Sequence, residues 1–139
     1  VHNLSNSLMD ESDLLIMNEP ELATLSGESP SGQLTSPVLM KSLEKILLTS
    51  SQSAIVTLGS QGVFVYENKI GTLIPGLDVL PVDTTGSGDC FVGALAAQYL
   101  VHGNLVDAAY FANKAAALSV TKKGASASMP TLEEVVNLT

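Results

Sequence analysis

Three short apolar runs, each bounded by turn residues, constrain the fold of this chain more than any other feature. They lie at residues 13–17 (DLLIM), 54–58 (AIVTL) and 63–66 (VFVY), and none alternates strictly between apolar and polar positions. A strand that is apolar on both sides must be buried on both faces, which is typical of a mainly parallel sheet covered by helices.

Helical patterns accompany these strands. The first is expected to start near Pro20, where the first turn of a helix tolerates proline, and to end at Gly27. We expect four more helices, at residues 38–48, 89–101 and 105–120 and, as a short one, after Thr131. The helix at 89–101 is apolar and almost free of charge. Strands that alternate with helices in this way predict an α/β fold with helices on both faces of the sheet.

Composition limits the class of protein. The 139 residues fit a single α/β domain, and 45% hydrophobic against 14% charged residues allows a real core. Fourteen acidic against six basic residues give a net charge of −8, which argues against binding to nucleic acid. No apolar run approaches membrane-spanning length, and the single cysteine, Cys90, suits a reducing compartment. We therefore expect a cytoplasmic protein that works without a membrane.

Residues 83–97, DTTGSGDCFVGALAA, carry the clearest chemical signal. Gly86 and Gly88 allow a sharp turn and a close approach of a ligand to the backbone. A helix N-terminus presents unpaired N–H groups and favours anions, so Asp89 would place a general base beside an anion site. An aspartate that simply caps the helix after an ordinary glycine turn produces the same string. The string alone leaves both interpretations open.

Two other strand ends carry polar or glycine-rich segments. Asn18-Glu19-Pro20-Glu21 follows the first strand, where its amide and carboxylate suit a hydrated Mg²⁺ and phosphate oxygens, or simply start a helix. Residues 57–62, TLGSQG, follow the second strand and either present N–H groups to a nucleotide or form an ordinary hairpin turn.

In this order and spacing, the segments resemble the ribokinase-like (phosphofructokinase-B type) family of carbohydrate kinases. The segment DTTGSGDCFVGA is similar to the family's C-terminal signature, D-T-x-G-(A/S)-G-D-x-F-x-G-A. NEPE and TLGSQG match its N-x-x-E and T-L-G-x-x-G elements, and the tail VTKKGASASMP matches its last loop. The resemblance runs from about Asp13 to Pro130 and is greatest to ribokinases. It implies a three-layer α/β/α fold, of which this chain would be the C-terminal, nucleotide-binding half.

The resemblance also implies roles for individual residues. Asp89 would be the catalytic base and contact the substrate hydroxyl, and Gly86, Ser87 and Gly88 would form the anion hole. The nucleotide site would be lined by Asn18, Glu21, Thr57, Gly59, Gly62 and Asn113. Asn18 and Glu21 would also hold Mg²⁺ through water. Oxygen ligands for K⁺ would come from Asp83, Thr85, Ser119, Gly124 and Ser128.

The implied reaction is transfer of the γ-phosphoryl group of ATP to a sugar hydroxyl, with Mg²⁺ and K⁺ as cofactors and D-ribose giving ribose 5-phosphate. A nucleoside kinase such as adenosine kinase, a fructokinase, and a non-catalytic nucleotide-binding fragment remain as alternatives. Family members are about twice as long, so the N-terminal half with the sugar-holding residues and the lid is expected to be missing. We therefore expect residues 1–139 to be inactive alone. For the full-length protein, the resemblance implies a homodimer.

Cys90 follows the predicted base directly, and we expect it to be a packing residue. A lowered thiol pKa at the helix N-terminus is the alternative.

Overall fold

A computed structural model describes residues 6–27, 35–47 and 49–138. The chain divides into two compact units, each described by itself. The sheet unit comprises residues 1–58 and 63–73, and the helical unit comprises residues 59–62 and 74–139. Elements of the first part of the chain, in order, are α1 (Asn6–Asp10), β1 (Leu14–Asn18), α2 (Glu19–Ser26), α3 (Ser36–Ile46), β2 (Ser53–Thr57), a 3-10 turn (Gly59–Gln61), β3 (Gly62–Glu67) and β4 (Ile70–Pro75).

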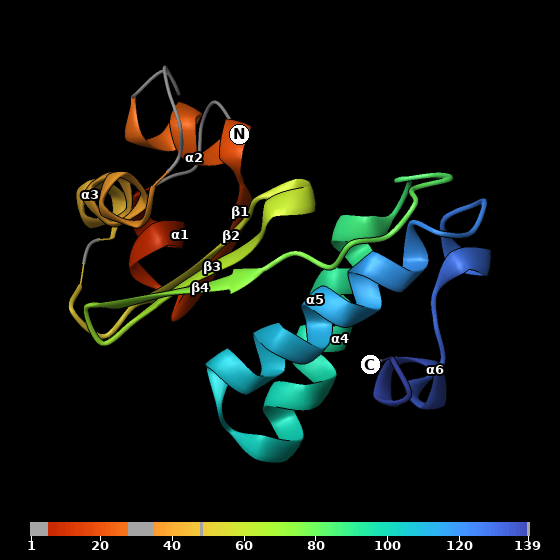
Figure 1. The fold of residues 1–139 in the computed structure, drawn as a ribbon. Helices are drawn as coiled ribbons and strands as arrows, with labels where there is room; N and C mark the ends of the chain where they lie inside the picture. Colours follow the sequence, from red (N-terminus) through yellow and green to blue (C-terminus); the bar gives the residue numbers. More distant parts are fainter. Residues whose placement is uncertain (1–5, 28–34, 48, 139) are drawn as a thin grey trace. The chain divides into compact units, whose positions relative to one another are not determined.

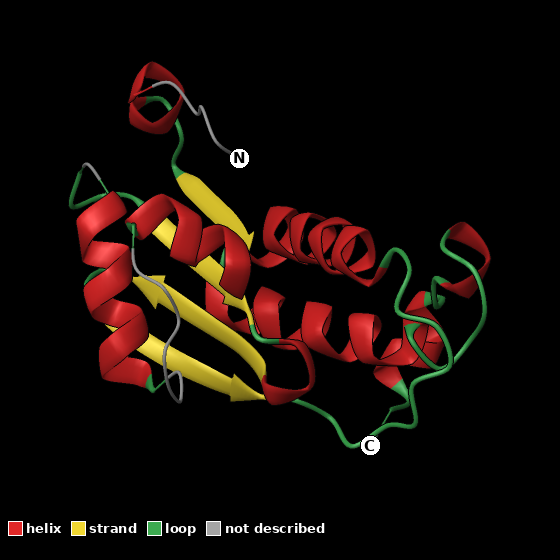
Figure 2. Ribbon diagram, turned by 90° about the horizontal axis from the view of Figure 1, so that it is seen from above, coloured by secondary structure: helices red, strands yellow, loops and turns green. Residues whose placement is uncertain are grey.

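The sheet has the strand order β1-β2-β3-β4 and is mixed (Figure 2). β1 runs parallel to β2, with Ile16 opposite Ile55, whereas β2 runs antiparallel to β3, with Val56 opposite Phe64. This differs from the mainly parallel sheet expected from the apolar runs. The physical reason is the connection from β2 to β3, since a turn of a few residues joins only antiparallel neighbours and a parallel pair needs a long crossover.

β2 and β3 are buried on both faces, as their uninterrupted apolar runs predict, whereas Met17 is the one buried residue of β1. On one face, α2 and α3 contribute Leu22, Leu39 and Leu43 to a cluster with Val56 and Phe64, and each of these side chains is at most 3% exposed. The side chains of β2 and β3 that face the other side of the sheet, those of Ile55, Val63 and Val65, are equally buried. Complete burial of such a side chain stabilises the fold by about 1.5–3 kcal/mol.

Local signals set the ends of α2. Asn18 caps its N-terminus, Pro20 lies in its first turn, and Gly27 ends it in the left-handed conformation with φ +70°. The start and the end predicted from the sequence are therefore confirmed. The predicted helix at 38–48 is α3, which begins two residues earlier and ends at Ile46; Leu48 lies outside the described residues.

The helical unit contains two long helices that pack side by side, α4 (Ser87–His102) and α5 (Leu105–Ser119) (Figure 1). After α5 come a 3-10 turn (Ser126–Ser128) and the short helix α6 (Leu132–Val136). Cys90 of α4, Ala115 of α5 and Val135 of α6 form a buried cluster that holds the three helices together. Within residues 6–27, 35–47 and 49–138, no helix combines the length and the apolar character that crossing a bilayer requires.

Candidate active site

The N-terminus of α4 begins at a glycine rather than at an aspartate. Gly86 is the N-cap, with φ +77°, and it provides no side-chain cap. A Cβ on Gly86 would lie 3.0 Å from the Cβ of Ala125, so both the backbone conformation and the space favour glycine here. Asp89 is the third residue of the helix, two positions further into the helix than the sequence pattern predicts. Asp89 is therefore not the cap.

The four backbone N–H groups at the start of α4 differ in whether they have an acceptor. The N–H of Ser87 donates to the carbonyl of Thr84 at 3.2 Å, and that of Cys90 donates to the carbonyl of Gly86 at 2.9 Å. Between them, the N–H groups of Gly88 and Asp89 find no acceptor within the part of the chain that the structure describes. Two donors at the positive end of a sixteen-residue helix form a favourable position for an anion.

The carboxylate of Asp89 is not held by another side chain or by the backbone in the described residues. It is exposed, and in the described ranges it takes part in neither a hydrogen bond nor an ion pair. A Cβ placed on the neighbouring Gly88 would meet nothing within 4 Å, so the space in front of these two residues is open. The arrangement leaves a carboxylate free to accept a proton beside two free N–H donors.

Asp83 is, by contrast, tightly held. Its Oδ1 accepts the N–H of Thr85 at 3.0 Å and its Oδ2 accepts the N–H of Gly124 at 2.9 Å. These bonds, that from Gly124 first, lower the pKa of the Asp83 carboxyl to about 2. Asp83 therefore stays ionised across the physiological range and joins two segments that lie 41 residues apart.

The residues predicted to bind K⁺ are only partly brought into contact. Asp83 is hydrogen-bonded to Thr85 and to Gly124, whereas Ser119 and Ser128 use their hydroxyls locally, on the carbonyls of Ala116 and Ala125 at 2.8 Å each. Both serines are buried, 2% and 1% exposed.

The donor set nevertheless suits a hard cation. Every predicted ligand atom is oxygen, and the ionised carboxylate of Asp83 is oriented by Thr85 and Gly124. In the described part of the chain, His, Cys, Asp and Glu side chains nowhere gather in threes as a transition-metal site would require.

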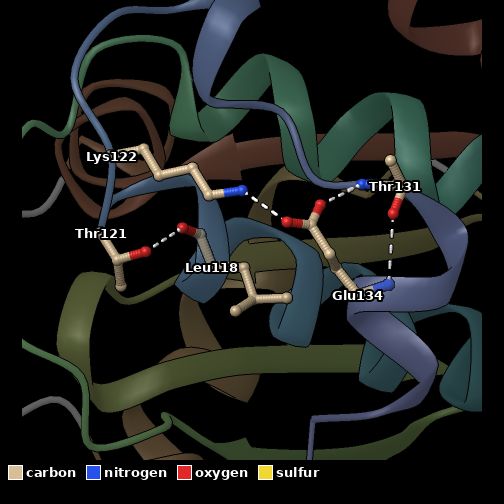
Figure 3. A network of polar contacts seen from close by, with 5 residues as sticks. All are labelled: Leu118, Thr121, Lys122, Thr131 and Glu134. Carbon is tan, nitrogen blue, oxygen red and sulfur yellow. Dashed lines mark hydrogen bonds and ion pairs between the residues drawn. The ribbon is translucent and has the colours of Figure 1, made fainter.

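The loop that carries Gly124 is fastened at its other side by an ion pair (Figure 3). Lys122 Nζ lies 2.7 Å from Glu134 Oε1, and Glu134 Oε2 accepts the N–H of Thr131 at 2.7 Å. The hydroxyl of Thr131 accepts the N–H of Glu134 in return, which completes a capping box at the start of α6. The hydrogen bond from Lys122, and to a lesser extent that from the Thr131 N–H, lowers the pKa of Glu134.

Cys90 is a packing residue in the structure. It is 6% exposed, and burial raises the pKa of its thiol, with a hydrogen bond to Ser119 acting in the opposite direction. The alternative of a lowered thiol pKa is therefore wrong, because the loss of hydration outweighs the hydrogen bond with Ser119.

The glycine turn after β2 contains two different glycines. Gly59 has φ +56° and open space around it, whereas a Cβ on Gly62, with φ +106°, would overlap the backbone at Ile74 and Gly76. The N–H of Gly76 donates to the carbonyl of Gln61 at 3.0 Å across this crossing. Gly62 is thus required by packing, while Gly59 faces space that a ligand can enter.

The remaining predicted nucleotide residues have structural partners of their own. Asn18 and Glu21 form a reciprocal capping box on α2, with N–O distances of 2.9 and 2.8 Å. Asn113 is buried, and its Nδ2 donates to the carbonyl of Pro75 at 2.9 Å. Thr57 is half-buried at the end of β2. Asn18, Glu21 and Thr57 belong to the sheet unit, and the other predicted site residues belong to the helical unit.

Comparison with known proteins identifies the family. Residues 3–132 match the model of the pfkB family carbohydrate kinases. The chain belongs to this family.

Individual relatives agree with this assignment. The chain is 37% identical to a ribokinase of Staphylococcus aureus over 134 residues, which cover 95% of this chain and 43% of that protein. Its fold is similar to that of Arabidopsis thaliana ribokinase, solved with ribose and ATP, with a TM-score of 0.85 and 30% identity over 96% of this chain and 43% of that one. Vibrio cholerae fructokinase, solved with fructose, ADP and potassium, gives a TM-score of 0.77 and 26% identity over 94% and 41%.

These similarities confirm the ribokinase-like α/β fold that the motifs predict. The chain spans only about two fifths of the length of these pfkB relatives, 41–43%.

Sequence reasoning missed two residues that shape this candidate site. Gly76 faces Gly62 at the backbone crossing, and Ala125 packs against Gly86. Gly76 follows Pro75 directly, and this Pro-Gly pair is a turn signal that the sequence shows. Ala125 carries no local signal, because its role depends on a glycine 39 residues earlier in the chain.

Proposed function

We propose that the protein carrying this chain transfers the γ-phosphoryl group of ATP to a sugar hydroxyl, with D-ribose as the first candidate. The observation that carries the proposal is Asp89, at the third position of α4, whose carboxylate has no hydrogen-bond or ion-pair partner among the described residues and lies beside the uncapped N–H groups of Gly88 and Asp89. An exposed carboxylate is ordinary by itself, but Asp89 stands at a helix start that no side chain caps, whereas Asn104 accepts the N–H of Asp107 at the start of α5.

The proposed chemistry needs little more than this geometry. Asp89 accepts the proton of the attacking hydroxyl, whose oxygen forms the new bond to the γ-phosphorus while the bond to the leaving ADP oxygen breaks. Negative charge on the transferred phosphoryl oxygens lies in front of the N–H groups at the start of α4, which include that of Gly88. Gly86 and Ser87 shape the turn, and Ser87 does so through its bond to Thr84.

Cations would act electrostatically in this scheme. Asp83 and the carbonyls of Thr85, Ser119 and Gly124, with the hydroxyl of Ser128, are proposed to hold K⁺, which when bound would add positive charge beside the anion site. The potassium in the Vibrio fructokinase structure supports this proposal. The chain's own part is the ionised Asp83 carboxylate, oriented by Thr85 and Gly124.

Several residues are proposed to contact the nucleotide or its metal ion. Asn18 and Glu21 are proposed to hold Mg²⁺ and the ATP phosphates through water, because the capping box leaves Glu21 Oε1 and Asn18 Nδ2 uncommitted. Gly59 is the best supported of the proposed nucleotide contacts because of its open surroundings. Thr57, Gly62 and Asn113 are the others, and residues 1–139 are thus proposed to form the nucleotide-binding half of the kinase.

Fructose is the second candidate substrate. The Vibrio fructokinase similarity favours it, while the Staphylococcus and Arabidopsis ribokinases favour ribose. Initial rates with ribose and with fructose, measured in the protein that carries these residues, decide between them. A protein that binds ATP but phosphorylates neither sugar would favour the non-catalytic interpretation.

The test of the base is Asp89→Asn, with Asp107→Asn as a matched control. Both aspartates are exposed and occupy the third position of their helices, α4 and α5, so both substitutions remove the same favourable interaction with a helix N-terminus. We expect Asp89→Asn to lower kcat by about 10²–10⁴-fold without weakening ATP binding, and Asp107→Asn to leave kcat unchanged. Equal rates in both variants would remove Asp89 from the mechanism.

A further inference from the structure

The loop between α5 and α6, residues 120–131, is attached to the rest of the helical unit at two separate places. At the first, the carbonyl of Val120 accepts the N–H groups of Val82 and Asp83 at 2.7 and 3.1 Å, and Gly124 donates to Asp83 Oδ2 at 2.9 Å. At the second, Lys122 Nζ meets Glu134 Oε1 at 2.7 Å (Figure 3). The first attachment belongs to the proposed site, and the second does not.

The anchor of the second attachment is itself held in place. Glu134 Oε2 accepts the N–H of Thr131, so the carboxylate is fixed to the start of α6. The neighbouring Val135 is 2% exposed and packs against Cys90 and Ala115, which docks α6 on α4 and α5. Lys122 is therefore paired with a carboxylate whose position is fixed by the packing of α6 and by the Thr131 N–H.

What Lys122 holds lies directly against the N-terminus of α4. Lys122 is two residues before Gly124, the donor to Asp83, and three before Ala125. Ala125 packs so closely on Gly86 that a Cβ there would lie 3.0 Å from the Ala125 Cβ. A shift of the backbone at Lys122 would move both contacts together.

We propose that Lys122 and Glu134 are positioning residues, whose ion pair clamps the α5–α6 loop so that Gly124 stays on Asp83 and Ala125 stays on Gly86. Neither side chain touches a reacting group. The role in catalysis rests on the proposed function, because it acts through the cation and anion positions at the start of α4, whereas the clamp itself is a property of the loop.

The size of the effect follows from exposure. Each side chain of the pair is 44% exposed, so solvent screens the interaction and the closed loop gains up to about fivefold in its equilibrium with open forms. Removal of the charge should therefore loosen the loop without unfolding the protein. The effect should also fade with added salt, since screening shortens the range of such pairs.

The first measurement is amide hydrogen exchange on the full chain without added cation or nucleotide. Glu134→Gln removes the charge, and Glu133→Gln makes the same change on the same turn of α6 without touching Lys122. We expect exchange at the Gly124 amide to quicken up to about fivefold in Glu134→Gln and to stay at the parent rate in Glu133→Gln. The amide of Gly103, which donates to the carbonyl of Tyr99 at the opposite end of α4, should not change in either variant.

The conservative variant Lys122→Arg keeps the charge and should keep the parent rate at Gly124, while tetramethylammonium chloride should reduce the difference between Glu134→Gln and the parent. If Glu134→Gln quickens only the Val135 amide, which donates to Thr131, the pair serves α6 alone and the proposal is overturned. An unchanged Gly124 amide also overturns it.

The second measurement separates the clamp from the proposed function. In the protein that carries this chain, Glu134→Gln should raise the K⁺ concentration for half-maximal phosphorylation up to about fivefold, with kcat at saturating K⁺ unchanged. If Gly124 responds but phosphorylation shows no K⁺ dependence, the clamp stands and the cation part of the proposed function fails. If Gly124 does not respond, the clamp fails whatever the rates show.

Discussion

Two glycines at the start of α4 should respond in opposite ways to the same substitution. Gly86 has φ +77° and contacts Ala125, whereas Gly88 lies within the helix and a Cβ on it would meet nothing within 4 Å. Gly86→Ala should therefore destabilise the fold, while Gly88→Ala should stabilise it. Each substitution adds one methyl group, so differences in chemistry do not complicate the comparison.

The magnitudes follow from these surroundings. At Gly86, left-handed backbone strain costs about 1–2 kcal/mol and the tight contact with Ala125 about 1 kcal/mol. The smaller freedom of alanine in the unfolded chain returns about 0.5–1 kcal/mol, which leaves a net loss of about 1–2 kcal/mol. At Gly88, alanine replaces glycine in a helix and gains about 0.5–1 kcal/mol. The two variants should differ by about 2–3 kcal/mol in the free energy of unfolding.

The Gly88→Ala variant should lose activity although it gains stability. A Cβ in a helix tilts toward the N-terminus, so the new methyl group at Gly88 would enter the space in front of the free N–H groups. Displacing the phosphoryl group by about 1 Å would cost about 10²-fold in kcat. Gly88→Ala should thus be more stable and much slower.

The assay is urea unfolding followed by far-UV circular dichroism, together with kcat in the protein that carries the chain. With m near about 2 kcal/mol per M, the two midpoints should differ by about 1 M, with Gly88→Ala the higher. Equal midpoints would contradict the steric reasoning. A Gly88→Ala variant with full activity would show that this space does not receive the phosphoryl group.

Two further predictions concern other parts of the helical unit. The pKa of Asp83 is lowered from 3.8 to about 2, so the stability that this carboxylate contributes is complete above about pH 4 and is lost as the pH falls through 2. Asp83→Asn should flatten the fall of the urea midpoint in that window, and an unchanged slope would exclude this origin. Gly62→Ala should cost about 3 kcal/mol or more, because its Cβ overlaps the Ile74 carbonyl, whereas Gly59→Ala, in open left-handed backbone, should cost about 1 kcal/mol. Equal urea midpoints would refute the distinction.

The helices and strands were largely predictable because their signals are local. Pro20 and Gly27 mark the ends of α2, and the T-x-x-E spacing of Thr131 and Glu134 marks the start of α6. The helix at Asp89 starts two residues earlier than predicted, since a left-handed glycine cap leaves less trace than a capping side chain. The direction of β3 beside β2 follows from the short turn between them rather than from the apolar character of either strand.

The candidate site divides in the same way. The sequence alone determined which residue types stand at each strand end and helix start, because hydrophobic period, caps and glycine turns depend on neighbours a few positions away. Only the tertiary structure decided their state. It pairs Asp83 with Gly124 and, among the residues that the structure describes, gives the Asp89 carboxylate no partner. Such outcomes depend on segments about forty residues apart in the chain, whose meeting is fixed by packing of the whole unit and leaves no local pattern in the sequence.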